Sequence, residues 1–410
     1  MYRKTSSQHN KVIRTKIITS TVGVVVVASL GGGYLYSQDL QKPLTNTARA
    51  SAPTPAVPIS SGAVVSPQPL ASISTASNVT SLTPTSSGTW GVEQSSSGSS
   101  TNADKYDLIE SANGQSGITR VIPLNINGFQ GVAFDSSGSY AYVLSLPVSQ
   151  TQSAQPATTS SSSSTTSTPS VTLTQVSLST GQTQTSSTFD LNPKTIQNPT
   201  YGGGNIYLGG QVASGSNAGK WVMGVIDPSN LSIKTDIVLP GTLINSQSIA
   251  TNEYATVSVP SNFGQSYRLI SISSSTATVT SNNQVPLGFT PSSFAGGLVW
   301  GLEQSTGQLL GVDPATGSVA TRDILTSSGK FTPVYAVSSS GNTVYALASS
   351  VGSPSTQSVV LYKINALDGS VLTQELLSGL HPNAGPGEVV VSNNLILING
   401  ANALHVLTDN

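Results

Sequence analysis

Residues 298–325 read LVWGLEQSTGQLLGVDPATGSVATRDIL. Three short stretches within this segment, LVWGLEQ, QLLGVD and SVATRDIL, are apolar or alternate between apolar and polar residues. The connectors STG and PATG are rich in turn-forming residues, as antiparallel hairpins require. The pattern therefore predicts three consecutive antiparallel β-strands.

Comparable patterns of strands and turns recur along the chain. Residues 89–124 contain TWGVEQ, KYDLIESANG and GITRVIPL, and residues 359–377 read VVLYKINALDGSVLTQELL. Shorter hairpin patterns, such as GVAFDSSGSYAYVLSL at 131–146, stand between them. Pairing the two kinds predicts units that begin near residues 77, 125, 193, 241, 288, 326 and 379, about 44 residues each once one insertion is set aside.

Four-stranded units of this length, repeated several times, are typical of a β-propeller. Each unit has two apolar faces, which only neighbours on both sides can bury. We therefore expect an all-β propeller with seven blades, or with six, and two stacked β-sandwiches are the alternative. The last unit, whose strand pattern begins at residue 388, stops after three strands. Residues near 57–65 are expected to donate its fourth strand.

Two outer-strand patterns also resemble a known repeat. VDPATGSVATRDI (312–324) and KINALDGSVLTQEL (363–376) are similar to the outer strands of the YVTN and quinoprotein-like β-propeller repeats. The likeness covers roughly residues 77–410 and implies a β-propeller. A Trp tends to follow the Thr-Gly turn in the quinoprotein repeat, whereas nonaromatic residues follow it here. We therefore expect no quinone, and no other cofactor is predicted.

The chain before the repeats predicts export. Residues 1–16 form a basic leader, and residues 17–36 contain no charge, which is just long enough for a helix that spans a bilayer. The basic flank predicts a cytoplasmic N-terminus, a single-pass anchor and a C-terminal domain outside the cell. The alternative is a signal peptide, which is cleaved near residues 48–50 to release a secreted protein.

Two further segments have a low-complexity composition. Residues 37–76 are rich in Ser, Thr, Pro and Ala, which predicts a flexible stalk in front of a propeller at 77–410. Residues 147–169 interrupt the second unit and are expected to form a hydrophilic surface loop.

Composition excludes several classes of function. The chain has no Cys, which removes disulfides and thiol chemistry. Five of its 16 basic residues precede residue 17, so 11 basic and 17 acidic residues remain, and nucleic acid is not an expected partner. Charged residues make up only 8 %, which predicts that stability varies little with pH.

The candidate site residues are two Glu-Gln pairs and one histidine. Glu93-Gln94 and Glu303-Gln304 each follow a Trp-Gly and end the second strand of a unit. In a propeller they would share one loop-bearing face with His381. Carboxylates at a channel mouth could bind a cation or a sugar, or act as acid and base. Their recurrence argues equally for a structural cause, such as capping a turn.

No other pattern indicates chemistry. The three histidines have no metal-ligand spacing, and no G-x-S-x-G elbow occurs, so we predict neither a metal site nor a catalytic residue. The expected function is binding or scaffolding for a protein, a glycan or a cell-envelope partner. The alternatives are a propeller enzyme, such as a lactonase-like hydrolase or a quinone-linked dehydrogenase, and a structural component of a surface layer.

Overall fold

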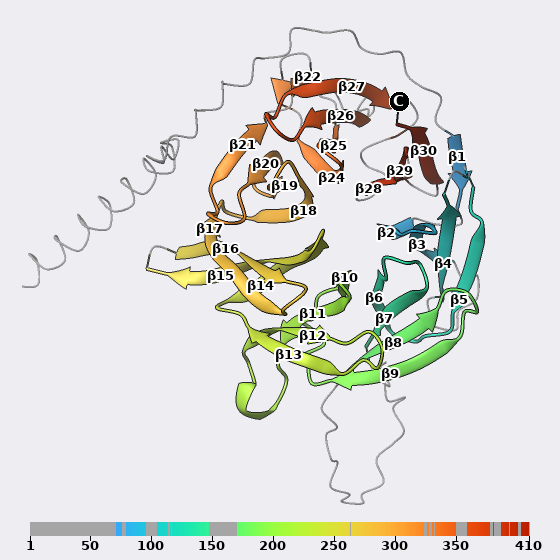
Figure 1. Ribbon diagram of the computed structural model, residues 1–410, viewed down its shortest axis with the longest axis vertical. Helices are drawn as coiled ribbons and strands as arrows, with labels where there is room; N and C mark the ends of the chain where they lie inside the picture. Colours follow the sequence, from blue (N-terminus) through green and yellow to red (C-terminus); the bar gives the residue numbers. More distant parts are fainter. Residues whose placement is uncertain are drawn as a thin grey trace, which may run out of the picture. The chain divides into compact units, whose positions relative to one another are not determined.

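In the computed structural model, seven four-stranded antiparallel sheets are arranged in a ring (Figure 1). The structure describes residues 71–75, 79–95, 105–113, 115, 117–146, 170–262, 264–323, 326–327, 330–331, 333–349, 359–377, 380, 387–392, 394–400 and 403–409. All of them belong to one compact unit, Pro53–Asn410. The sheets are called blades 1 to 7 in chain order, and the fold is a seven-bladed β-propeller, as the repeat predicted.

Blades 1 to 6 are each built from four consecutive strands, with the first strand nearest the centre of the ring (Figure 1). Blade 1 comprises β2 (Val79–Pro84), β3 (Gly88–Ser95), β4 (Lys105–Ala112) and β5 (Arg120–Leu124). Blade 2 comprises β6 (Phe129–Phe134), β7 (Tyr140–Ser145), β8 (Val171–Ser177) and β9 (Thr183–Phe189). Blade 3 comprises β10 (Thr200–Gly202), β11 (Asn205–Gln211), β12 (Trp221–Ile226) and β13 (Ile233–Val238), with the 3₁₀ turn η1 (Gly215–Asn217) before β12.

The other half of the ring follows the same order. Blade 4 comprises β14 (Thr242–Ile249), β15 (Asn252–Ser261), β16 (Gly264–Ser273) and β17 (Thr278–Val285). Blade 5 comprises β18 (Phe289–Ala295), β19 (Leu298–Glu303), β20 (Gln308–Val312) and β21 (Val319–Asp323). A small hairpin of β22 (Thr326–Ser327) and β23 (Lys330–Phe331) leads to blade 6, which comprises β24 (Val334–Ser340), β25 (Thr343–Ser349), β26 (Val359–Asn365) and β27 (Val371–Leu377).

Blade 7 combines the two ends of the propeller. Its inner strands are β28 (Val389–Ser392), β29 (Leu395–Gly400) and β30 (Ala403–Thr408), and its outer strand is β1 (Ala71–Ser74). β1 pairs antiparallel with β30, with Ala71 opposite Val406. Donation of the fourth strand from the N-terminal side is thus confirmed.

The prediction that residues near 57–65 supply this strand was wrong, because Ala71–Ser74 occupies the outer edge of β30. The propeller therefore begins at least six residues before the expected start at 77, inside the segment 37–76 that was predicted to be a stalk. Only residues 75–78 separate β1 from β2. Four extended residues span roughly 14 Å, about the width of three strand spacings, so a short link suffices to reach the next blade.

A five-residue turn joins the third and fourth strands of blades 2 to 6. In each, the fifth residue donates its backbone N–H to the carbonyl of the first at 2.7–2.8 Å and has a positive φ. The five positive-φ residues are Gly181, Leu231, Ala277, Gly317 and Gly369. Glycine is favoured there because a Cβ strains a left-handed backbone, and it explains why Thr-Gly and Asp-Gly turns recur in the sequence.

The core lies between blades rather than inside each sheet, because the middle strands bury both faces. Trp90 and Trp300 are fully buried, and they pack in separate apolar clusters between blades 1 and 2 and between blades 5 and 6. Alternation is clear on the first strand of blade 5, whereas the outer strand of blade 3 buries hardly any of its residues.

The predicted anchor at 17–36 and the predicted loop at 147–169 lie outside the described residues, as do residues 1–16. Within the residues that are described, no helix is long and apolar enough to cross a membrane.

Candidate functional site

The first predicted polar pair lies within a continuous strand. Glu93 is on β3, opposite Val79 of β2 and Asp107 of β4, and only 7 % of it is exposed. Its neighbour Gln94 faces solvent opposite Tyr106. β3 continues to Ser95, so the pair does not end the strand as expected.

The second pair lies at the end of a strand, where a turn begins. The backbone carbonyl of Glu303 accepts hydrogen bonds from Thr306 N and Gly307 N at 3.2 and 2.8 Å. Its carboxylate Oε2 accepts from Thr306 Oγ1 at 2.5 Å. Gln304 is exposed, and its N–H donates to the carbonyl of Gly288. Glu303 thus caps a turn. This is the structural role that the sequence indicated as the alternative to a binding role.

The structure does not bring the two pairs together. Glu93 is in blade 1 and Glu303 is in blade 5, with three blades between them on one side of the ring and two on the other (Figure 1). His381 lies outside the described residues. A shared site of Glu93, Gln94, Glu303, Gln304 and His381 stays a prediction.

If Glu303 is a turn cap, Glu303→Ala and Thr306→Ala should each lower the free energy of unfolding by about 0.5–1 kcal/mol. The double variant should lose little more than either single variant, because both remove the same hydrogen bond. Denaturant unfolding of the three variants checks this. Fully additive losses would show that the Glu303 carboxylate is stabilised by something other than Thr306.

The turns between third and fourth strands also dock on the preceding blade. Ser281 and Asn283 of β17 donate to the carbonyl of Pro314 in the blade 5 turn, at 2.8 and 3.0 Å. Arg120 of β5 donates to the carbonyl of Leu178 in blade 2 at 2.9 Å. These contacts close the rim between blades 4 and 5 and between blades 1 and 2.

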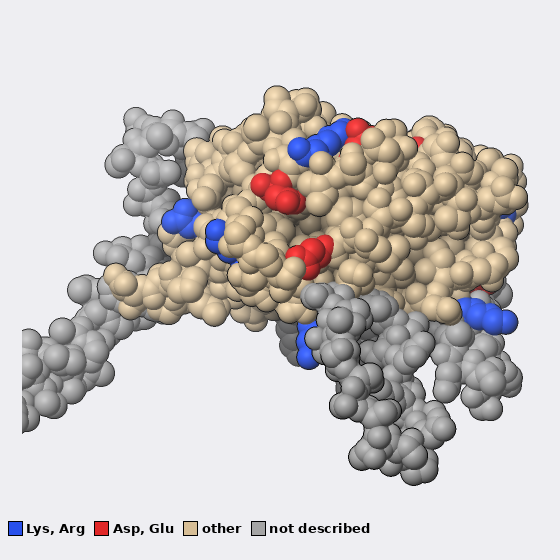
Figure 2. Space-filling view, turned by 90° about the horizontal axis from the view of Figure 1, so that it is seen from below, with Lys and Arg blue, Asp and Glu red and all other residues tan. Residues whose placement is uncertain are grey.

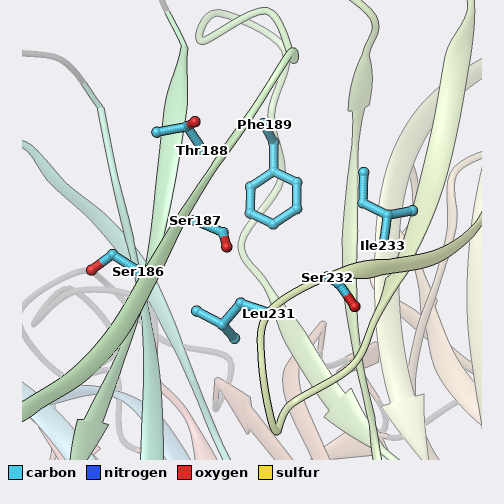
Figure 3. A pocket seen from close by; sticks show the side chains of 7 residues that line it. All are labelled: Ser186, Ser187, Thr188, Phe189, Leu231, Ser232 and Ile233. Carbon is cyan, nitrogen blue, oxygen red and sulfur yellow. The ribbon is translucent and has the colours of Figure 1, made fainter.

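The rim between blades 2 and 3 is open. A groove of about 510 Å³ lies between the outer strand β9 and the β12–β13 turn (Figure 3). Its lining residues carry no charge: Ser186, Ser187, Thr188, Phe189, Leu231, Ser232 and Ile233. The described contact that holds the turn here comes from Gln175 on β8, whose Nε2 donates to the carbonyl of Pro228 at 3.2 Å.

Strand register explains why this rim is open. Ser187 pairs with Leu173, two residues before the bulge that follows Gln175. In blade 4 the same place is held by Asn283, which pairs with Leu269, two residues before the bulge after Ser271. The Asn283 amide reaches the next blade's turn. The serine at 187 is too short for this contact, which leaves the groove.

Two glutamates at blade junctions, one fully buried and one partly buried, were not recognised from sequence. Glu253 on β15 is fully buried, and burial raises its pKa to about 7, while hydrogen bonds from Ser248 and Thr200 act in the opposite direction. Burial also raises the pKa of Glu388, which precedes β28 and accepts backbone hydrogen bonds from blade 1. The only sequence signal for either residue was its position directly before an apolar stretch that was expected to form a buried strand.

Charge on the surface is sparse. Figure 2 shows few Lys, Arg, Asp and Glu side chains on one side of the propeller, and uncharged residues cover most of this side. Among the described residues, no group of three or more His, Asp or Glu side chains could hold a metal ion.

Neither a protein-family model nor a curated protein sequence matches this chain. Several solved structures are similar to it. The β-propeller domain of Cps50 (Swd1) from Myceliophteria thermophila has a TM-score of 0.50 and 10 % identity, over 81 % of this chain and 97 % of that one. The β-propeller domain of the Trilobed protease from Pyrococcus furiosus has a TM-score of 0.49 and 9 % identity, over 79 % and 91 %.

BamB from Moraxella catarrhalis has a TM-score of 0.41 and 11 % identity, over 82 % of this chain and 99 % of that one. At 10 % identity, the likeness to the Cps50 (Swd1) propeller concerns the fold alone. It agrees with the propeller that the strand order defines.

Proposed function

We propose that this chain is a membrane-anchored, extracytoplasmic β-propeller that binds a protein partner in the groove between blades 2 and 3. The location rests on the basic leader and the uncharged segment at 17–36. The binding role rests on one observation above all, the open rim beside β9, whereas side-chain hydrogen bonds close the rims between blades 1 and 2 and between blades 4 and 5.

The groove suits an extended polypeptide segment. β9 is the outermost strand of blade 2, and no further described strand pairs with its outer edge. Edge strands offer unpaired backbone N–H and C=O groups, which an added strand can satisfy. Natural edges are often protected by Lys or Pro, but β9, with the sequence TQTSSTF, contains neither.

The side chains that line the groove favour an uncharged ligand segment. Phe189 and Leu231 are buried at its floor, and Ile233 at its rim is 49 % exposed. A single aliphatic side chain of the partner would cover Ile233, while Ser187 and Ser232 would provide hydrogen bonds. A charged side chain would have no counter-ion among the lining residues.

One variant tests both location and binding, because the chain has no native cysteine. Ser187→Cys should be labelled by a membrane-impermeant maleimide on intact cells that produce the full chain. A maleimide with a photoreactive group should then give a discrete adduct with one other protein. The matched control is Thr278→Cys, which is exposed on the outer strand of blade 4. It should be labelled equally and form no such adduct.

Ser187→Asn is the companion variant, since it restores the residue that closes the rim between blades 4 and 5. It should weaken capture of the partner at least tenfold and leave the melting temperature within about 2 °C. Labelling only after cell lysis would contradict the location. Equal adducts from both cysteines, or none, would contradict binding in the groove, and an adduct with a second copy of this chain would support a surface-layer component instead.

A further inference from the structure

Glu253 is a buried carboxyl group without a counter-ion. Its side chain is 0 % exposed at the junction of blades 3 and 4. Oε2 accepts from Thr200 Oγ1 of blade 3 at 2.9 Å and from Ser248 Oγ of blade 4 at 2.5 Å, whereas Oε1 has no hydrogen-bond partner. The ion pairs of the described residues involve other carboxylates. An ionised carboxylate at such a place is costly, so the protonated form is favoured.

Polar groups of both blades face this carboxyl group. Tyr207 of β11 and Ser274, which follows β16, are buried, and their hydroxyl oxygens also have no hydrogen-bond partner. Burial raises the pKa of Tyr207, and the nearby Glu253 charge raises it further. The hydroxyl groups of Tyr207 and Ser274 are therefore uncharged near pH 7.

Glu253 lies on β15, and β10, β11, β14, β16 and β18 pack around it. The other titratable or charged side chains of these strands point away from Glu253: Tyr201, Tyr254, Tyr267 and Arg268. Tyr201 stacks on Tyr142 of blade 2. The other two tyrosines pack in the apolar cluster between blades 4 and 5, and the guanidinium donates to Asn282 on β17. No cation among these strands is placed to stabilise the ionised form.

The junction has little room to adjust to a charge. The β10–β11 turn lies directly against blade 4, since a Cβ on Gly202 would come within 2.9 Å of Ser248 Cβ. At Gly203, which has a φ of +55°, a Cβ would come within 2.1 Å of Ser274 Cβ. An ionised Glu253 would therefore gain little hydration from this side unless the turn moved away from blade 4.

We propose that Glu253 forms a pH-sensitive latch between blades 3 and 4, which is closed while its carboxyl group holds a proton and loosens when the proton leaves. The latch changes how firmly the β10–β11 turn is held. It is independent of the proposed groove, which lies at the opposite edge of blade 3.

The direction of the pH effect follows from the pKa. Burial raises the pKa of Glu253 from 4.5 to about 7, so its stabilisation is complete below about pH 4.5 and is lost as the pH rises through 7. His405 changes the stability in the opposite direction. Burial lowers the pKa of His405, so the folded state is destabilised when the pH falls below about 6.5 and the imidazole takes up a proton. The expectation of a flat pH profile is thus replaced by a loss of stability between about pH 5 and 8.

The test compares the full chain with Glu253→Gln, which is neutral at every pH and keeps the shape of the carboxyl group. The folding equilibrium constant of the wild-type protein should fall about 100- to 1,000-fold between pH 4.5 and 8. The constant of Glu253→Gln should fall at least tenfold less than that of the wild type, because the contributions of Glu388 and His405 are the same in both proteins. Glu303→Gln, at an exposed turn of blade 5, is the matched control and should keep the wild-type slope.

Hydrogen exchange of the wild-type protein gives an independent measurement if Glu253→Gln fails to fold. After correction for the intrinsic rate, amides of β10, β11 and β14 should lose more protection between pH 5 and pH 8 than those of β24 and β25, which should follow only the change in global stability. An identical pH slope in wild type and Glu253→Gln, or unchanged protection at blades 3 and 4, would overturn the proposal.

Discussion

Replacing Trp300 with alanine is expected to lower the free energy of unfolding by about 3–5 kcal/mol. The indole is fully buried between blades 5 and 6, where it packs against Leu309 and Val344. Its Nε1 donates to the carbonyl of Ala295 at 3.1 Å. Truncation therefore leaves a cavity at a blade junction and also removes the hydrogen bond to the Ala295 carbonyl, and neighbouring blades cannot close the gap without shifting the ring.

Two substitutions separate these effects. Trp300→Phe keeps most of the packing and removes the hydrogen bond, so it should cost about 1–3 kcal/mol. Trp221→Ala is the matched control, because Trp221 is partly exposed at the start of β12 and should lose clearly less than Trp300→Ala. Denaturant unfolding followed by tryptophan fluorescence measures all three. A loss at Trp300→Ala no larger than at Trp221→Ala would show that the junction tolerates the cavity.

The fold could be predicted from sequence because its signals are local. Each hairpin lies within a few tens of residues, and the turns that end in Gly181, Gly317 and Gly369 mark the boundary between third and fourth strands. The Trp-Gly motif recurs because Trp90 and Trp300 each fill the apolar cluster between two blades. Seven units follow from counting such signals along the chain.

The donated strand could not be placed in the same way. Ala71–Ser74 has no stronger apolar pattern than the preceding residues, and its pairing is defined only by the register with β30. That contact joins residues more than 300 positions apart. Local β-propensity does not decide between several short candidates when any of them could fill the same edge.

The two glutamates at blade junctions were missed for the same reason. Glu253 contacts Thr200, 53 residues away, and Glu388 contacts Ser81, 307 residues away. Neither contact has a spacing that a motif would reveal. The Glu-Gln motif was recognised because it recurs, and the two glutamates occupy equivalent places, since Glu93 pairs with the first residue of β2 and Glu303 with the first residue of β18. The surroundings differ, because β3 continues past Glu93 whereas a turn follows Glu303.

The strongest expected effect at ring closure comes from Glu388. Its Oε1 accepts from Ser81 N at 3.1 Å and its Oε2 from Leu82 N at 2.8 Å, so a single side chain of blade 7 binds two backbone donors of blade 1. Ser81 has a φ of +56° at the bulge of β2, which leaves these N–H groups without strand partners. Asn399 supports the same junction, since its Nδ2 donates to the carbonyl of Val79.

Glu388→Ala should lower the free energy of unfolding by about 2–4 kcal/mol, because two donors lose their acceptor in a partly buried place. Glu388→Gln retains one acceptor oxygen and should lose about half as much. Burial raises the pKa of Glu388, so its contribution, like that of Glu253, weakens as the pH rises above the carboxyl's ordinary range. Glu375→Ala, which removes a partner of Lys363 within blade 6, is the control for losing a glutamate away from the closure.

Hydrogen exchange distinguishes opening of the ring from general destabilisation. In Glu388→Ala, the amides of β2, β28 and β29 should lose protection before those of blades 3 to 5, because only noncovalent contacts hold β28, β29 and β30 of blade 7 to β1 and to blade 1. The β1–β30 pairing joins the two ends of the propeller through four residues only, so it cannot replace the Glu388 contacts. Uniform loss of protection around the ring would mean that closure and blade packing unfold as one cooperative unit.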